Sequence, residues 1–257
     1  MRGASYYGPD LASIHDAGYS DFGRAAARGV VDVLRRAGIR RGRIVELGCG
    51  AGAATRELVA AGYDVLAIDA SPAMLRLARR QVHGARFARG RLPAVTIPSC
   101  DAVVAIGEVL SYMQGRAAFA PLFRRVACAL RSGGVFAFDV RQPARRATQT
   151  VHGRVAADWA VLSIATETRG TLVRRITSFR RTRRGYRRRD ETHRLTLLPA
   201  TELARRLRRA GFVVRVAGAY GRVCVPATHA VVIARKLAGG RRAPADHATR
   251  RRVTASD

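Results

Sequence analysis

A glycine-rich segment near residue 50 has the residue types and spacing of a small-ligand site. Residues 45–47 read as the end of a short buried strand, and Gly48-Cys49-Gly50-Ala51-Gly52 follows directly. Glycine lets the backbone turn sharply there, and the free amides that open the next helix point into the turn. Asp69 ends the next strand, at the range where such folds bind the two hydroxyls of a ribose. The pattern therefore predicts a nucleoside-binding site at a sheet edge.

The glycine spacing separates two kinds of nucleotide site. Dinucleotide-binding proteins use G-x-G-x-x-G, and the third glycine is missing here because Ala53 and Ala54 follow Gly52. Glu46 also lies at the strand's end, where a dinucleotide site is normally apolar. The run ELGCGAG, followed by IDASPAML, resembles the class I S-adenosylmethionine-dependent methyltransferase family, over residues 43–140 and again over 212–236. A nicotinamide oxidoreductase is the disfavoured alternative, and a non-catalytic module that keeps the fold as a scaffold is another.

The resemblance implies a donor site for S-adenosyl-L-methionine, with S-adenosyl-L-homocysteine as the product. Asp69 would bind the ribose, while Ala70 and Met74 would pack near the adenine. Many family members carry an Asp after the third strand, and this chain has Gly90-Arg91-Leu92 there, so Leu92 offers its backbone only. Plain core packing is the alternative for Met74 and Leu92. The residues implied to hold the donor are Tyr19, Glu46, Gly48, Cys49, Gly50, Gly52, Asp69, Ala70, Met74, Leu92 and Ile106.

Three residues are candidates for the chemistry itself. Methyl transfer from a sulfonium is a direct displacement, so a base is needed only where the nucleophile must lose a proton. Glu108 follows the fourth strand, where open α/β sheets place their ligands, and it could orient the donor or the acceptor or act as base. A solvated loop acid is the alternative. Ser111 and Tyr112 lie in the same loop.

The second candidate is His193. Glu191 and His193 are two residues apart in an extended segment, so their side chains share one strand face. Close relatives in the family carry a similar Arg-x-x-Glu-x-His run in an inserted sheet over the active site, which implies that His193 is a proton acceptor. The alternative is a cross-strand ion pair with the arginine-rich neighbouring strand.

The third candidate is Tyr19. With Tyr6, Tyr7 and Phe22 it could form an aromatic lid that excludes water and contacts the sulfonium by cation–π attraction. Simple packing of this segment is the alternative. We expect no metal, because His15 and Asp16 have no second ligand cluster nearby.

The order of predicted elements indicates an α/β fold. A Rossmann-like sheet with helices on both faces is predicted for residues 43–150 and 199–237, because strands and helices alternate there. Residues 1–42 form an N-terminal lid with a helix over 22–37. Three extended segments, 159–168, 171–181 and 186–198, predict an inserted antiparallel β-meander within 151–198 that covers the active site. Residues 238–257 are predicted to be a disordered basic tail.

The composition of the chain limits which binding partners are expected. The formal net charge is +29 and almost all of it is arginine, which looks like genome composition and predicts non-specific attraction of polyanions. An inserted cover favours a small-molecule acceptor, which must be enclosed to be oriented. An RNA or protein methyltransferase that uses the basic surface is the alternative. No apolar run is long enough to span a membrane, four scattered cysteines indicate a cytoplasmic protein, and the oligomer is left between monomer and homodimer.

Overall fold

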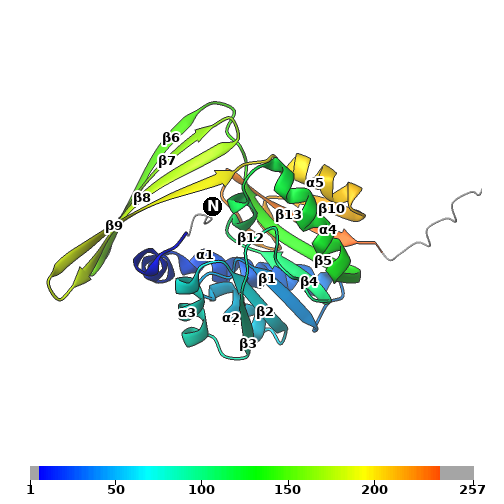
Figure 1. The fold of residues 1–257 in the computed structure, drawn as a ribbon. Helices are drawn as coiled ribbons and strands as arrows, with labels where there is room; N and C mark the ends of the chain where they lie inside the picture. Colours follow the sequence, from blue (N-terminus) through cyan, green and yellow to red (C-terminus); the bar gives the residue numbers. More distant parts are fainter. Residues whose placement is uncertain (1–5, 238–257) are drawn as a thin grey trace, which may run out of the picture.

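The computed structural model describes residues 6–237, which form two sheets and their covering helices (Figure 1). The larger sheet has seven strands in the order β10-β13-β5-β4-β1-β2-β3. Neighbouring strands among β1 to β5 run parallel, and β13 is antiparallel to both of its neighbours. The strands are β1 (Arg43–Leu47), β2 (Asp64–Asp69), β3 (Ala85–Arg89), β4 (Cys100–Ala105), β5 (Leu130–Arg141), β10 (Phe212–Ala217) and β13 (His229–Lys236).

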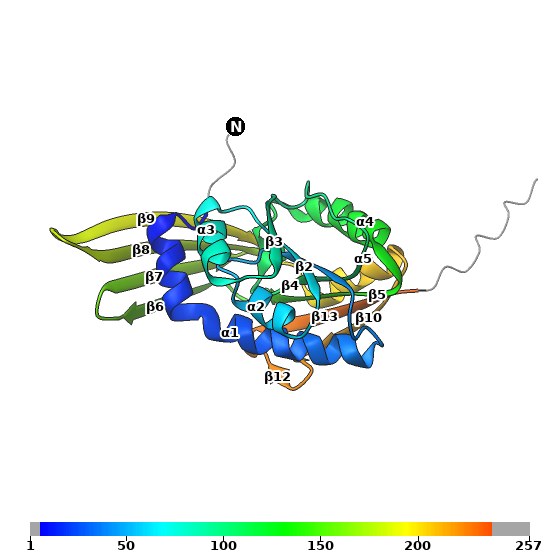
Figure 2. The same ribbon diagram turned by 90° about the horizontal axis from the view of Figure 1, so that it is seen from below.

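Helices cover both faces of this sheet, because its central strands are apolar on both sides. α1 (Pro9–Arg36), α2 (Ala53–Ala60) and α3 (Pro72–Gln81) pack on one face, and α1 runs along its whole length (Figure 2). α4 (Phe119–Ala129) and α5 (Ala200–Arg209) pack on the other face. Shorter elements complete the chain: the 3₁₀ helices η1 (Val109–Tyr112) and η2 (Arg116–Ala118), and the hairpin β11 (Ala219–Tyr220) with β12 (Val223–Cys224).

The smaller sheet, here named the cover sheet, is antiparallel in the order β6-β7-β8-β9. Its strands are β6 (Thr148–Val155), β7 (Trp159–Thr168), β8 (Thr171–Thr182) and β9 (Gly185–Thr196). It projects from the core as a long arm (Figure 1). β6 is an addition to the three predicted strands: most of its residues are exposed, so it has no apolar alternation and is defined by its ladder with β7. The predicted α/β class with an inserted antiparallel meander is confirmed.

α1 begins earlier than the sequence predicts. The expected helix starts at residue 22, whereas α1 starts at Pro9. Leu11 and Ile14, in its first turns, are buried against Trp159 and Val161 of β7. Since these partners lie about 150 residues away along the chain, a local pattern could not show that this segment has an apolar face. The predicted basic tail, 238–257, lies outside the described residues.

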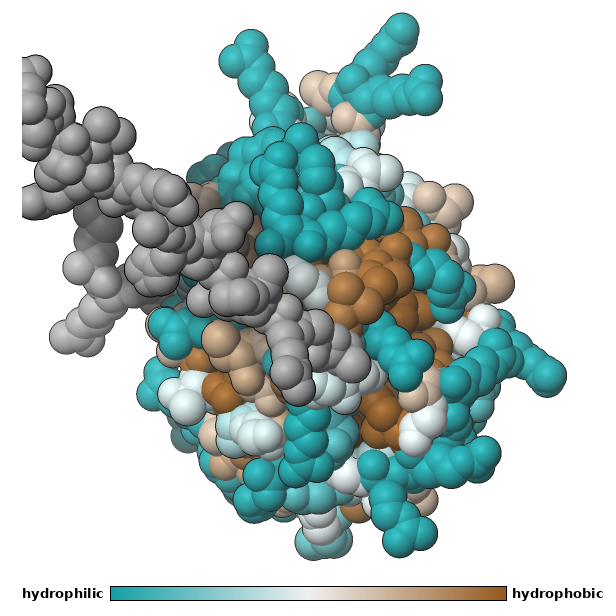
Figure 3. All heavy atoms as spheres, turned by 90° about the vertical axis from the view of Figure 1, so that its right-hand side faces the viewer, coloured by the Kyte–Doolittle hydropathy of each residue, from teal (hydrophilic) through white to brown (hydrophobic). Residues whose placement is uncertain are grey.

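The described chain, residues 6–237, contains no helix that is both long enough and apolar enough to cross a membrane. The end of the molecule opposite the cover sheet carries many hydrophilic side chains around an apolar strip (Figure 3).

Candidate functional site

A cavity of about 620 Å³ opens at the edge of the large sheet where β1, β2 and β4 end. This volume lies in the range of roughly 300–1,000 Å³ that small-molecule sites occupy. Residues of the segment before α1, of α1 itself and of β9 close the cavity from the other side. Ten of the predicted donor residues line it: Tyr19, Glu46, Gly48, Cys49, Gly50, Asp69, Ala70, Met74, Leu92 and Ile106.

Three predicted residues lie behind the lining. Gly52 is the residue before α2, with φ +90°, and a Cβ there would lie 2.9 Å from Val82, so it allows α2 and α3 to pack closely. His193 is buried and Glu108 is largely buried just outside the cavity, and each is hydrogen-bonded to other side chains.

The glycine turn and Asp69 form one hydrogen-bonded unit. Asp69 Oδ2 accepts from the amide of Gly50 at 2.9 Å, and its Oδ1 accepts from the amide of Ser71 at 2.7 Å. Burial raises the pKa of Asp69, although these backbone donors oppose the shift. Gly48 has φ +70°, and a Cβ on it would lie 2.5 Å from Val109. The turn after β1 is therefore shaped by the loop after β4 as well as by its own sequence.

Glu46 places a second carboxyl group in the cavity wall. Its side chain is buried and accepts from Thr55 Oγ1 at 2.6 Å. Burial raises its pKa to about 7, against the opposing effect of the Thr55 hydroxyl. The neighbouring Cys49 thiol is buried too, and burial raises its pKa well above the usual value, so it stays a neutral thiol.

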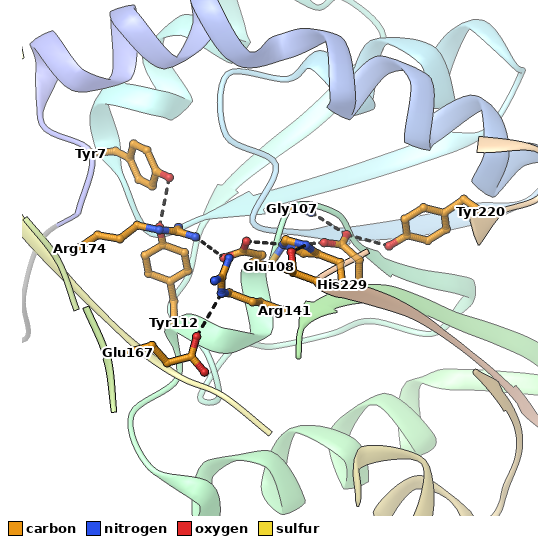
Figure 4. A network of polar contacts seen from close by, with 11 residues as sticks. Tyr7, Gly107, Glu108, Tyr112, Arg141, Glu167, Arg174, Tyr220 and His229 are labelled. Atoms are coloured by element: carbon orange, nitrogen blue, oxygen red, sulfur yellow. Dashed lines mark hydrogen bonds and ion pairs between the residues drawn. The ribbon is translucent and has the colours of Figure 1, made fainter. Parts of the chain in front are cut away.

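Asp139, near the end of β5, fixes the loop after β4. Its carboxylate accepts from the amides of Gly107 at 2.8 Å and Glu108 at 3.0 Å, and from the Tyr220 hydroxyl at 2.9 Å (Figure 4). Gly107 and Glu108 both have positive φ, of +91° and +60°. A non-glycine residue rarely adopts this conformation, so the two amide bonds to Asp139 stabilise a strained turn.

Glu108 is a paired, buried carboxylate rather than a solvated loop acid. His229 Nε2 lies 2.6 Å from its Oε1, and Arg174 Nη2 donates to its Oε2 at 2.8 Å. Burial would raise the pKa of Glu108, but the hydrogen bond to His229 and the charge of Arg174 outweigh it and lower the pKa to about 2. Such a group is ionised at neutral pH and is a weak base.

His193 lies at the centre of a chain of side chains that reaches the cavity. It is fully buried, with Nε2 2.9 Å from Glu191 Oε2 and Nδ1 3.2 Å from the Tyr112 hydroxyl. The Tyr112 hydroxyl lies 3.1 Å from that of Tyr7, and both tyrosines line the cavity. Glu191 also accepts from the backbone amides of Tyr7 and Gly8, each at 2.8 Å. Its cross-strand neighbour on β8 is Ile176, so its side-chain partner is His193 rather than an arginine of that strand.

The aromatic residues near the N-terminus divide into two groups. The rings of Tyr6 and Tyr7 contact the ring of His193, with centroids 4.7 and 4.9 Å apart. Tyr19 lies at the cavity rim, 45% exposed, stacked on His15 and with the Arg154 guanidinium 5.4 Å above its ring.

Several residues of the site were not predicted from the sequence. Arg174 and His229 come from β8 and β13, and nothing in their local sequence marks them as partners of Glu108. Asp139 carried a usable signal, since it is an acid inside the apolar run of β5. Tyr7 and Tyr112 were expected near the pocket, but not as hydrogen-bonded partners of each other.

Comparisons with known proteins agree with this geometry. Residues 44–134 match the family described as methyltransferase domain. Trans-aconitate 2-methyltransferase of Methylobacterium nodulans is 30% identical over 151 residues, which cover 56% of this chain and 57% of that enzyme, so the chain spans little more than half of this relative. A solved S-adenosylmethionine-dependent methyltransferase from Clostridium acetobutylicum has a TM-score of 0.76 at 18% identity, covering 89% of this chain and 98% of that one. The sugar N-methyltransferase KedS8 from Streptoalloteichus has a TM-score of 0.76 at 19% identity, covering 93% and 98%. At these identities the solved structures establish the fold.

Proposed function

We propose that the chain is a class I S-adenosylmethionine-dependent methyltransferase that transfers the donor's methyl group to an N, O or S atom of a small molecule. One observation carries this proposal. A single cavity joins the glycine turn and Asp69 at one end to the side chains of Tyr7, Tyr112 and Arg194 at the other. The donor end and the acceptor end thus share one enclosed space, which is what transfer between two small molecules requires.

The residues present fit the donor. Bound S-adenosylmethionine supplies an electrophilic methyl group on a sulfonium. The cradle is formed by the turn at Gly48 and Gly50, where φ is +70° and +55°, and a Cβ at Gly48 would collide with Val109. Asp69 would bind the ribose hydroxyls, and Glu46 would face the donor's charged amino-acid end. Ala70, Met74, Leu92 and Ile106 would line the remaining surface.

The three predicted catalytic residues receive different roles in this proposal. Glu108 is a positioning residue, because its two oxygens are held by Arg174 and His229. Tyr19 covers the mouth of the cavity, where its ring would contact the donor. His193 takes up a proton from the acceptor, although it does not line the cavity itself.

The setting of the protein is part of the proposal. Its four cysteines are unpaired thiols, as expected of a cytoplasmic protein. The acceptor is a small molecule, and binding of polyanions to the arginine-rich surface is non-specific, so it weakens as salt is raised. The protein acts as a monomer or homodimer.

Two measurements test the proposal. Calorimetry with S-adenosylhomocysteine should show binding that Asp69→Ala abolishes, whereas Asp64→Ala, at the exposed start of the same strand, should leave it intact. Labelled methyl from S-adenosylmethionine should then enter the low-molecular-mass fraction of a cell extract near physiological salt. Label that enters large molecules and is removed by nuclease would support the RNA alternative, and tight binding of NAD instead of S-adenosylhomocysteine would support an oxidoreductase.

A further inference from the structure

We propose that Tyr7, Tyr112, His193 and Glu191 form a proton relay, and that the acceptor is a small molecule whose nucleophilic atom loses a proton during transfer. This inference rests on the proposed function and narrows its substrate class to amines, hydroxyls and thiols that carry such a proton. Tyr7 would be the catalytic residue that touches the acceptor. The other three act through it.

The direction of the relay follows from Glu191. Its Oε1 accepts from the Gly8 amide and its Oε2 from the Tyr7 amide, and neither amide can do anything but donate. Burial would raise the pKa of Glu191, but the hydrogen bonds from His193 and from these amides outweigh it and lower the pKa. Glu191 is therefore an ionised acceptor, and His193 Nε2 must carry a hydrogen to bond with it.

Each further bond is then determined in turn. In the neutral imidazole, a hydrogen on Nε2 leaves Nδ1 as an acceptor, so the Tyr112 hydroxyl donates to Nδ1. The Tyr112 oxygen in turn accepts from the Tyr7 hydroxyl. Within residues 6–237, Tyr112 is the hydrogen-bond partner of the Tyr7 hydroxyl, so the Tyr7 oxygen keeps its capacity to accept from a molecule in the cavity.

The proton balance follows from this order. As the acceptor atom bonds to the methyl carbon and the sulfur–methyl bond breaks, the acceptor's proton passes to the Tyr7 oxygen. The Tyr7 proton moves to Tyr112, and the Tyr112 proton moves to His193 Nδ1. His193 becomes an imidazolium paired with Glu191, and both tyrosines are neutral again. After the products leave, His193 Nδ1 passes its proton back to Tyr112, Tyr112 passes one to Tyr7, and Tyr7 releases one to solvent in the open cavity, which restores the starting arrangement.

The environment of Tyr7 and Tyr112 favours passing a proton along over holding a charge on either tyrosine. Burial raises the pKa of Tyr7 and, more strongly, that of Tyr112, so both hydroxyls remain protonated at rest. Arg174 is the cross-strand neighbour of His193, and its positive charge opposes this rise at both tyrosines. It would stabilise a phenolate that forms in passing.

The groups around His193 in residues 6–237 bear on where the proton goes. The titratable and charged groups that face His193 are Glu191, Tyr112, Tyr6, Tyr7, Arg174 and His15. Burial lowers the pKa of His15 to about 4, so it is neutral at physiological pH.

A spectroscopic experiment tests the direction without any acceptor. In ¹⁵N-labelled protein bound to S-adenosylhomocysteine, nuclear magnetic resonance should show neutral His193 with its hydrogen on Nε2 and Nδ1 as a hydrogen-bond acceptor. The Nδ1 resonance should move in Tyr112→Phe and stay in place in Tyr63→Phe, whose hydroxyl bonds to the Ile39 carbonyl far from the site. A hydrogen on Nδ1 of the neutral ring would overturn the relay, because Tyr112 would then be the acceptor.

A kinetic experiment tests whether the relay takes part in methyl transfer. Labelled methyl is transferred from S-adenosylmethionine to the low-molecular-mass fraction of a cell extract by the wild type, Tyr7→Phe, Tyr112→Phe and Tyr63→Phe. The first two variants should be slowed by about 100-fold or more, the typical contribution of proton transfer. Their affinity for S-adenosylhomocysteine should stay within about 2-fold of wild type, and Tyr63→Phe should match wild type throughout.

The outcomes separate the relay from the proposed function. A wild type that neither binds S-adenosylhomocysteine nor labels the small-molecule fraction contradicts the function. A wild type that labels it, with Tyr7→Phe and Tyr112→Phe equally fast, contradicts the relay alone.

Discussion

Arg174 of β8 and Glu108 of the core meet across the seam between the two sheets, with Nη2 of the arginine 2.8 Å from Oε2 of the carboxylate (Figure 4). Both side chains are largely buried, and His229 of β13 holds the second carboxylate oxygen. Arg141 and Glu167 add a longer contact across the same seam, at 3.5 Å. The ion pair therefore holds the cover sheet over the cavity at the point where Tyr7 and Tyr112 enter it.

Removing the arginine should loosen this seam. Arg174→Met leaves Glu108 buried with one partner fewer, and breaking a buried pair in this way costs about 3 kcal/mol. Urea denaturation should show that loss. Arg175→Met is the matched control, because Arg175 is exposed and its neighbour Thr192 lies on the opposite sheet face from His193. Equal stability of the two variants would mean that the pair does not hold the sheets together.

The same pair should govern stability in acid. Because the pKa of Glu108 is lowered from 4.5 to about 2, its pairing stabilises the folded protein fully above pH 4.5. This contribution is lost as pH falls from 4.5 towards 2, where the folded carboxylate becomes protonated. The stability difference between wild type and Glu108→Gln should therefore shrink across that window in urea titrations. Glu57→Gln removes an exposed pair with Arg28 and should show only a small difference at any pH. A Glu108 difference that is constant from pH 6 to pH 2 would contradict the assignment.

A methyl group at Gly48 should harm both the turn and the loop beside it. Gly48→Ala places Cβ 2.5 Å from Val109 and imposes a left-handed conformation on alanine. Gly38→Ala imposes similar strain, with φ +86°, but has nothing within 4 Å of its Cβ. We expect about 1–2 kcal/mol of destabilisation for Gly38→Ala, and more for Gly48→Ala, with weaker binding of S-adenosylhomocysteine in the latter alone. Gly48→Ala combined with Val109→Ala should recover part of the difference in thermal unfolding. Identical losses for both single variants would show that the contact with Val109 is unimportant.

The sequence predicted the parts of this site that lie close together along the chain. Gly48, Gly50 and Asp69 form a strand–turn–helix pattern that is local, and the pocket they line follows from it. Glu191 and His193 were expected on one strand face because a strand repeats every two residues, and their side chains are hydrogen-bonded to each other there. Their attachment to Tyr112 and Tyr7 was not predictable, because it depends on β9 lying against η1 and the segment before α1.

Charged partners from distant strands were the second kind of omission. Glu108 follows β4 as the sequence predicts, but its ionised, paired state depends on Arg174 and His229, which lie 66 and 121 residues further along the chain. β6 was missed for a different reason. Its side chains are mostly exposed, so the strand is defined by backbone pairing with β7, which leaves no apolar pattern in the sequence.

The charged carboxylate of Glu46 should lower the stability of the folded protein. Burial raises its pKa from 4.5 to about 7, so the charged carboxylate destabilises the folded protein above pH 7. The cost diminishes as pH falls from 7 to 4.5, because the folded protein binds the proton first. Glu46→Gln removes the charge and keeps an oxygen that can accept from Thr55. We expect this variant to be more stable than wild type above pH 7, by about 1–3 kcal/mol, and equal to it near pH 4.

Glu46→Gln should weaken binding at the donor site even though it stabilises the folded protein. In our proposal Glu46 faces the donor's amino-acid end, which carries a positively charged amino group. Only the ionised carboxylate of Glu46 attracts that amino group. Binding of S-adenosylhomocysteine to wild type should therefore weaken as pH falls below about 7, and Glu46→Gln should bind weakly without this pH dependence. Calorimetry from pH 6 to pH 8 measures both. Thr55→Val is the companion variant, since it removes the hydroxyl that stabilises the carboxylate and should lower stability instead of raising it. A stabilised Glu46→Gln that binds S-adenosylhomocysteine as tightly as wild type would place the donor's charged end elsewhere in the cavity.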